Sequence, residues 1–123
     1  MDFTADKPIY LQIADYVCER ILLHHWLQAE KIPSVRELAV SLSVNPNTVQ
    51  RSYAWLEEMN VIIMQRGVGY FVSKHGLARV FQLKKQAFLE DDLPKLFYQM
   101  DLLGINIKEL NQFYKVRGEH EKK

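Results

Sequence analysis

The side chains best suited to binding chemistry lie close together in sequence, in the short stretch that follows Asn45. They are small polar side chains and one arginine: Asn47, Thr48, Arg51 and Ser52. An asparagine amide can form two hydrogen bonds with an adenine edge, and an arginine guanidinium can form two with guanine O6 and N7. Hydroxyl groups can bond to bases or phosphates. At helical spacing, this set is typical of a helix whose first turns read DNA bases.

Two predicted helices position these side chains. Ser34 and Glu37 have the spacing of a capping box, which predicts a helix start at Ser34. Asn45 is predicted to cap a second helix whose first residue is Pro46, rather than to read a base. Only residues 43–45 then separate the two helices. An apolar stripe holds the second helix against a core and leaves its polar residues on other faces; it consists of Val49, Tyr53, Leu56 and Met59.

The flanking segments predict the rest of a small domain. Residues 7–26 carry an apolar residue at every fourth position from Ile9 to Ile21, which predicts an amphipathic helix that ends before Pro33. Residues 61–65 and 70–72 are β-rich and are joined by a glycine-containing loop, which predicts a hairpin. The predicted order is therefore three helices followed by a hairpin. The second and third helices form a helix-turn-helix, and the hairpin is its wing.

The chain beyond residue 75 is predicted to be helical. Apolar stripes indicate helices on both sides of Asp91, Asp92 and Pro94, which predict a kink or break between them. Gly104 should end the second of these helices, and a short last helix should begin after Asn106 and give way at Arg117 to a solvated, frayed tail. We therefore expect a domain over residues 1–74 and a helical region over residues 75–123.

This helical region has more apolar side chains than so short a segment can bury by itself. An exposed apolar stripe of this size on a monomer would be unusual, so the excess predicts a homodimer formed through these helices. The residues expected at the dimer interface are Leu77, Phe81, Phe88, Leu96, Phe97, Met100, Leu103, Leu110, Phe113 and Tyr114.

Composition limits the class of protein. The chain has 123 residues, of which 48% are hydrophobic and 25% charged, as in an ordinary globular domain. Its net charge of +1 gives no indication of a nucleic-acid or membrane partner. The single cysteine, Cys18, fits a reducing compartment, and no apolar run is long enough to span a membrane, so we expect a cytoplasmic protein.

Three segments together closely resemble the winged helix of the GntR family of bacterial transcription regulators. They are Ile32–Ala39, Val44–Tyr53 and Arg66–Val72, and the opening Pro8–Ile13 is similar as well. The start of the helix at Asn45–Thr48 and the short helical C-terminal region resemble the YtrA-type subfamily. The resemblance is detailed over residues 7–73 and general over residues 76–116.

The resemblance implies a homodimeric, cytoplasmic repressor that binds a two-fold symmetric, double-stranded DNA operator. Its targets are expected to include its own operon and neighbouring ABC-transporter genes. The implied DNA contacts in the major groove or on flanking phosphates are Arg36, Asn47, Thr48, Arg51 and Ser52, with Arg66, Gly67 and Gly69 of the wing along the neighbouring minor groove or backbone.

The chain departs from the family pattern at three places. Many relatives outside this subfamily have arginines at the positions of Pro46 and Gln50, so their operator sequences do not transfer. Relatives often have glycines at the positions of His24 and Ala29, which predicts a different shape for the approach to the second helix. Pro94 interrupts a helix that is often more continuous, which affects the expected dimer geometry.

Other functions receive less support from the sequence. No phosphate-binding loop, HExxH, paired CxxC or nucleophile elbow is present, so an enzyme is not expected, nor is a cofactor. His24 and His25 with Cys18 make a poor metal site, and no metal is expected. Arg36 can pair with Glu37 or Glu30 instead of DNA. Two alternatives stay open: a winged helix that binds a partner protein, and a repressor with a small-molecule or metal site at the dimer interface.

Overall fold

The structure is a computed structural model that describes residues 1–121 and the side chains of residues 1–118. The chain forms two compact units, Met1–Leu83 and Lys84–Lys123, which are described one at a time. The division falls later than the expected boundary at residue 74. Val80, on the helix that crosses the division, is fully buried in the core of the first unit. No helix in the described part of the chain is long and apolar enough to cross a membrane.

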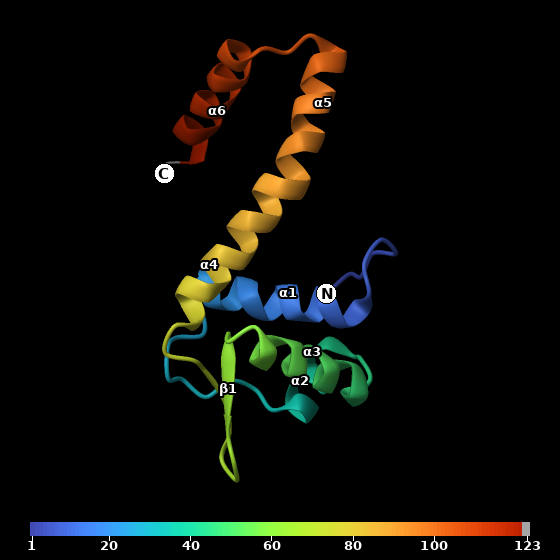
Figure 1. Cartoon of the computed structure of the whole chain (residues 1–123), viewed down its shortest axis with the longest axis vertical. Coiled ribbons are helices and arrows are strands. Elements are labelled where there is room, and N and C mark those ends of the chain that lie inside the picture. The colour runs from blue at the N-terminus through green and yellow to red at the C-terminus, as the bar shows by residue number, and fades with distance from the viewer. Residues whose placement is uncertain (122–123) are drawn as a thin grey trace. The chain divides into compact units, whose positions relative to one another are not determined.

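The first unit contains three helices, a hairpin and the start of a fourth helix (Figure 1). The elements are α1 (Ile9–Leu22), α2 (Val35–Leu42), α3 (Pro46–Glu58), β1 (Ile62–Gln65), β2 (Gly69–Val72) and α4 (Gly76–Ala87). The predicted class, mainly helical with a small hairpin, is confirmed. Helix α1 is shorter than the predicted range of 7–26, because His24 has a left-handed backbone conformation that a helix cannot continue through.

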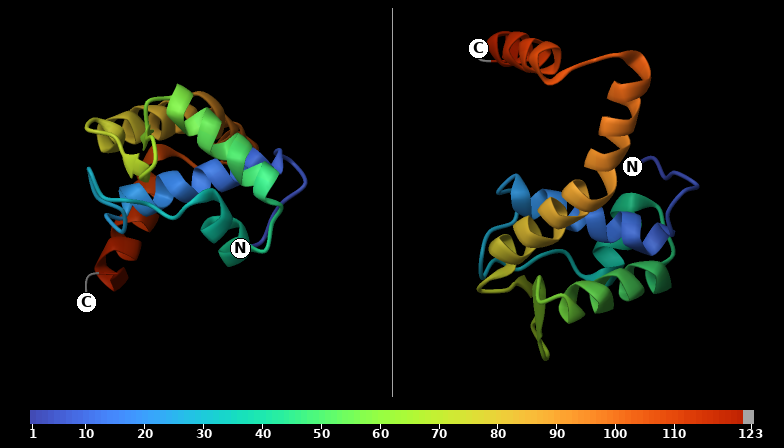
Figure 2. Two further views of the ribbon diagram at one scale, coloured as in Figure 1. Left: turned by 90° about the horizontal axis from the view of Figure 1, so that it is seen from below. Right: turned by 45° about the horizontal axis from the view of Figure 1, so that its top comes forward.

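One apolar core lies between α1, α2 and α3, and Figure 2 shows α1 against α3 from two further directions. Its members repeat every three or four residues along each helix, so each helix turns one face inward; they include Ile13, Val17, Ile21, Leu38, Val49, Tyr53 and Leu56, all at most 2% exposed. The Tyr53 hydroxyl donates a hydrogen bond of 2.6 Å to the Pro33 carbonyl. Burial raises the pKa of Tyr53 above its usual value, so the hydroxyl is a neutral donor that holds the segment before α2.

The predicted start of each helix in the helix-turn-helix is confirmed. Ser34 Oγ accepts from the Glu37 amide at 3.1 Å, and Glu37 Oε1 accepts from the Ser34 amide at 2.9 Å. These hydrogen bonds to Ser34 lower the pKa of Glu37 and keep it ionised. The turn between α2 and α3 is residues 43–45, with Ser43 in the left-handed region. Asn45 Oδ1 accepts from the Asn47 amide at 2.8 Å, as expected for a cap.

The hairpin is held on one side by the segment that links α1 to α2. Strands β1 and β2 are antiparallel, with Ile62 opposite Val72 and Gln65 opposite Gly69. The linker runs beside β2: the Ile32 amide donates to the Tyr70 carbonyl at 2.9 Å. Backbone pairing of this kind adds a short irregular segment to the edge of the small sheet and fixes the base of the wing.

The second unit is helical, and at the kink or break predicted for Asp91, Asp92 and Pro94 the structure has a local change of helix type. A π-helical turn, η1 (Phe88–Asp92), leads directly into α5 (Leu93–Leu103), where Pro94 occupies the first turn. Because a π turn shifts the hydrogen-bond pattern by one residue, it accommodates the amide that proline lacks. Gly104 ends α5 with φ +69°, as predicted. Helix α6 (Ile107–Glu121) continues past Arg117, where a frayed tail was expected; Lys122 and Lys123 lie outside the described residues.

The expectation of a differently shaped approach to α2 is not supported at the backbone. His24 has φ +60° and Ala29 has φ +61°, which is the left-handed conformation that glycine favours. The chain therefore adopts glycine-like backbone geometry at both positions without the glycines. For a residue with a Cβ atom, this conformation costs about 1–2 kcal/mol.

We expect Ala29→Gly to raise the free energy of unfolding by up to about 1 kcal/mol, because glycine removes the strain and loses part of the gain to chain entropy. The Ala29 amide keeps its 3.1 Å hydrogen bond to the Val72 carbonyl. Urea unfolding measures the change. Ala54→Gly, at an exposed position inside α3, is the matched control and should lower stability by about 1 kcal/mol. Equal destabilisation by both substitutions would contradict the assignment.

Candidate nucleic-acid interface

The first turns of α3 present polar side chains to solvent. Asn47 and Arg51 are exposed and Thr48 is half-buried, whereas Val49 on the opposite face is fully buried. All three polar residues line one shallow depression together with Pro8, Ile9 and Tyr10 at the start of α1. The structure thus brings together three of the predicted contacts at the positive end of a helix, which favours nearby phosphate.

Tyr10 positions Arg51, a role that sequence analysis missed. The Arg51 Cζ atom lies 3.9 Å from the centre of the Tyr10 ring, which is the geometry of a cation–π contact. Stacking restricts the guanidinium without using its hydrogen-bond donors, which stay available for a base or phosphate. Tyr10 and Arg51 are far apart in sequence, so no local pattern indicates that their side chains meet.

Ser52 does not belong to the interface, so its predicted role as a DNA contact is wrong. The residue is fully buried, and its Oγ donates to the Tyr10 carbonyl at 2.7 Å, with the Thr48 carbonyl at 3.0 Å. Helical spacing explains this: Ser52 lies between Val49 and Tyr53 on the inward face. Its hydroxyl connects α3 to the first turn of α1 and so fixes the helix that carries the contacts.

Two of the three predicted DNA contacts in the wing are exposed at its tip. Arg66 and Gly67 are exposed in the turn between the strands, and Gly67 has φ +78°. Gly69 is half-buried, and a Cβ atom there would lie 2.9 Å from Lys31 Cε. Gly69 therefore makes room for the Lys31 side chain, and Lys31 is an exposed cation beside the wing that sequence analysis did not select.

Some of the positively charged side chains on the first unit form contacts within the protein, and others do not. Arg36 is exposed near the start of α2, and within the described part of the chain it forms no ion pair, including the pairs considered with Glu37 and Glu30. Arg79, by contrast, is used structurally: its Nε donates to the Met59 carbonyl at the end of α3 at 3.0 Å. The free cations on the unit thus include Arg36 and Arg66, whereas Arg79 supports the frame.

Most residues predicted to form the dimer interface have exposed side chains on the single chain. Those at least 36% exposed are Phe81, Phe88, Leu96, Phe97, Leu103, Phe113 and Tyr114. Leu110 is half-buried. Leu77 packs against the core of the first unit, and Met100 is only 6% exposed, so these two contribute to the packing of the chain itself.

The remaining reactive side chains do not gather into a second centre. Among the side chains of residues 1–118, no three His, Cys, Asp or Glu groups are placed to hold a metal ion. Cys18 is buried in the core at 2% exposure, where it packs as a small apolar side chain. His25 lies within 3.1 Å of the Arg20 guanidinium, which occupies one of its ring nitrogens.

Comparison with known proteins identifies the fold and family. Residues 9–72 match the model of the bacterial regulatory proteins of the gntR family. The uncharacterised HTH-type transcriptional regulator YhcF of Bacillus subtilis is 37% identical over 108 residues, 88% of each chain. The HTH-type transcriptional repressor YtrA of the same bacterium is 30% identical over 115 residues, which are 94% of this chain and 88% of YtrA.

A solved structure extends the similarity through the helical region. The crystal structure of a GntR-family transcriptional regulator from Bacteroides thetaiotaomicron is 41% identical, covers 94% of this chain and 100% of its own, and superposes with a TM-score of 0.78. The family and these relatives are regulators of transcription and not enzymes. With its helix-turn-helix, its wing and this match, the chain belongs to the GntR family of bacterial transcription regulators, whose members bind DNA.

Proposed function

We propose that the chain is a homodimeric repressor that binds a two-fold symmetric operator. The observation that carries the proposal is the open face at the start of α3, where Asn47 and Arg51 are exposed and Tyr10 holds Arg51. In this mode, Asn47, Thr48 and Arg51 meet base edges in the major groove, and Arg36 meets a flanking phosphate. The repressor activity of the relative YtrA supports the sign of regulation.

The wing contacts the neighbouring backbone or minor groove. Arg66 supplies the charge, and Gly67 leaves the turn without a side chain, so that a sugar-phosphate edge can approach closely. Gly69 takes part by admitting Lys31 beside the hairpin. Contacts of this kind add affinity rather than sequence specificity, which resides in α3.

A second copy supplies the second half-site. One helix reads only a few base pairs, and two recognition helices about 34 Å apart read half-sites one DNA turn apart. The exposed aromatic side chains beyond residue 80 favour pairing between two copies, because burying each would contribute about 1.5–3 kcal/mol. Target genes are proposed from the family resemblance: its own operon and neighbouring ABC-transporter genes.

Arg51→Ala should weaken operator binding by about 1–3 kcal/mol per half-site without unfolding the protein, because Arg51 is exposed and lies outside the core. Fluorescence anisotropy with a duplex from upstream of the gene and a scrambled duplex measures the loss. Lys95→Ala, which removes the same charge from α5, is the matched control and should bind like the wild type. Unchanged preference for the upstream duplex in Arg51→Ala would favour the partner-protein alternative.

Substituting Glu for both Phe97 and Phe113 should convert a dimer into a monomer, since a charge placed in an apolar interface is costly to desolvate. Both side chains are exposed on the single chain, at 45% and 64%, so the fold of the chain should persist. Sedimentation equilibrium gives the mass. Val40→Glu, at an 81% exposed position on α2, is the control and should remain dimeric. A wild-type protein that stays monomeric at micromolar concentration would overturn the proposed dimer.

A further inference from the structure

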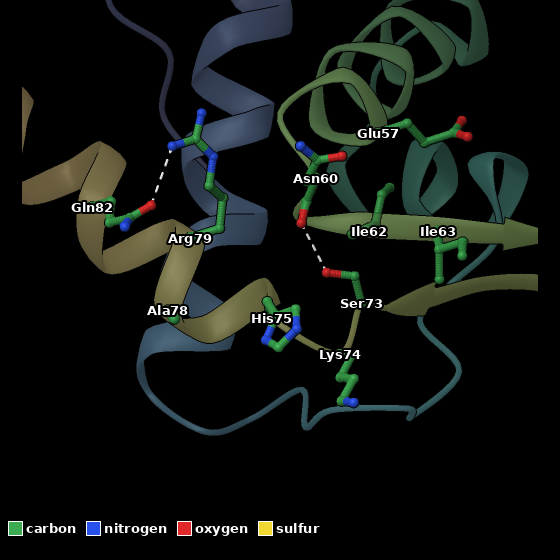
Figure 3. A pocket seen from close by; sticks show the side chains of 10 residues that line it. All are labelled: Glu57, Asn60, Ile62, Ile63, Ser73, Lys74, His75, Ala78, Arg79 and Gln82. Carbon is green, nitrogen blue, oxygen red and sulfur yellow. Dashed lines mark hydrogen bonds between the residues drawn. The ribbon is translucent and has the colours of Figure 1, made fainter.

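A pocket of about 750 Å³ lies in the first unit (Figure 3), and none of the side chains proposed to contact DNA lines it. It is formed by the end of α3, strand β1 and the first turns of α4. Its volume is within the usual range for sites that bind small molecules. Neither the helix-turn-helix contacts nor the proposed pairing of two copies uses it.

Hydrogen bonds and close packing hold the walls of this pocket together. Ser73 Oγ donates to the Asn60 carbonyl at 2.8 Å, and the Ser73 amide donates to the Val61 carbonyl at 3.0 Å. At the start of α4, a Cβ atom on Gly76 would lie only 2.6 Å from the Val61 carbonyl oxygen, so the two segments approach as closely as backbone allows. The pocket therefore has a defined shape before any ligand arrives.

The polar groups around the pocket favour an anion. Arg79 carries positive charge, and the His75 imidazole and the amides of Asn60 and Gln82 offer hydrogen-bond donors. Lys74 also lines the pocket, but Figure 3 shows its ammonium group directed away from the Arg79 guanidinium. Glu57 is the one carboxylate in the lining, and Figure 3 shows its carboxylate directed away from Arg79 and His75.

Arg79 has hydrogen-bond donors that no acceptor among the described residues uses. Its Nε donates to the Met59 carbonyl, and its Nη1 donates to Gln82 Oε1 at 3.3 Å. Within the described residues, no group accepts from its Nη2, which carries two N–H donors. A carboxylate or phosphate is the group that an arginine with free donors binds best. The exposed side chain of Ile63 and the small Ala78 add apolar surface beside it.

We infer that this pocket binds a small organic anion with one carboxylate or phosphate group and an apolar part. The anionic group lies against Arg79 and His75, and the apolar part lies on Ile63 and Ala78. The site belongs to the DNA-binding unit of a single chain, unlike a site at the dimer interface. Its occupancy does not depend on whether the chain binds an operator.

Benzoate and phenyl phosphate, with neutral benzamide as the matched control, test this inference on the full-length ¹⁵N-labelled protein. Either anion should produce saturable shifts in the amide signals of Asn60 and residues 73–79, whereas benzamide should not. Saturation by benzoate alone identifies a carboxylate site, and saturation by phenyl phosphate alone identifies a phosphate site. No saturable shift with either anion, or an equal shift with benzamide, overturns the inference.

Variants with opposite expected effects separate binding from a change in fold. His75→Ala should weaken anion binding by at least about threefold, because it removes a hydrogen-bond donor to the anion. Glu57→Gln should tighten it by a similar factor, because a nearby negative charge is removed. Lys85→Ala, on the last turn of α4, is the control and should not change affinity. Failure of Glu57→Gln to tighten binding contradicts the proposed anion site.

Discussion

The packing of α3 against α1 determines which side chains α3 presents to solvent, and these include the ones proposed to contact DNA. Val49, Ser52 and Tyr53 face inward and are fully buried, so the remaining faces of the first turns must carry Asn47 and Arg51 outward. A helix rotated by one residue would bury the arginine and expose Val49, at a cost of several kcal/mol. The polar contact surface is thus a direct consequence of the core.

Tyr10 contacts both the buried Ser52 and the exposed Arg51, which belongs to the proposed DNA-contact surface. Its carbonyl accepts the hydrogen bond of Ser52, and its ring lies under the Arg51 guanidinium. One residue at the start of α1 therefore fixes both the position of α3 and the direction of its arginine. Because a preorganised side chain loses less conformational freedom on binding, this arrangement favours affinity for DNA even though the net charge of the chain is only +1.

Local sequence signals predicted most of the frame. The capping box at Ser34, the cap at Asn45 and the apolar repeat from Ile9 to Ile21 depend on residues a few positions apart, and the structure confirms them. The same signals failed where distant segments meet. The hydrogen bond from Ser52 to the Tyr10 carbonyl joins residues 42 positions apart in sequence, and no local pattern shows it.

The wing and the region near Pro94 give two further examples of this limit. The segment between α1 and α2 pairs with β2 through hydrogen bonds such as that from the Ile32 amide to the Tyr70 carbonyl. The residue types of this segment do not indicate that pairing. Asp91, Asp92 and Pro94 predicted a kink or break, and the structure has a π-helical turn over Phe88–Asp92 directly before α5. In both cases the backbone found an acceptable hydrogen-bond pattern that residue types alone do not specify.

Mapping backbone amide shifts on addition of an operator duplex tests the central claim most directly. The claim is that the open face of α3, with the start of α2 and the tip of the wing, is the surface that meets DNA. The account predicts that the largest shifts fall in residues 34–37, 45–51 and 66–69. Large shifts confined to residues 84–118, with those three segments unchanged, would contradict it.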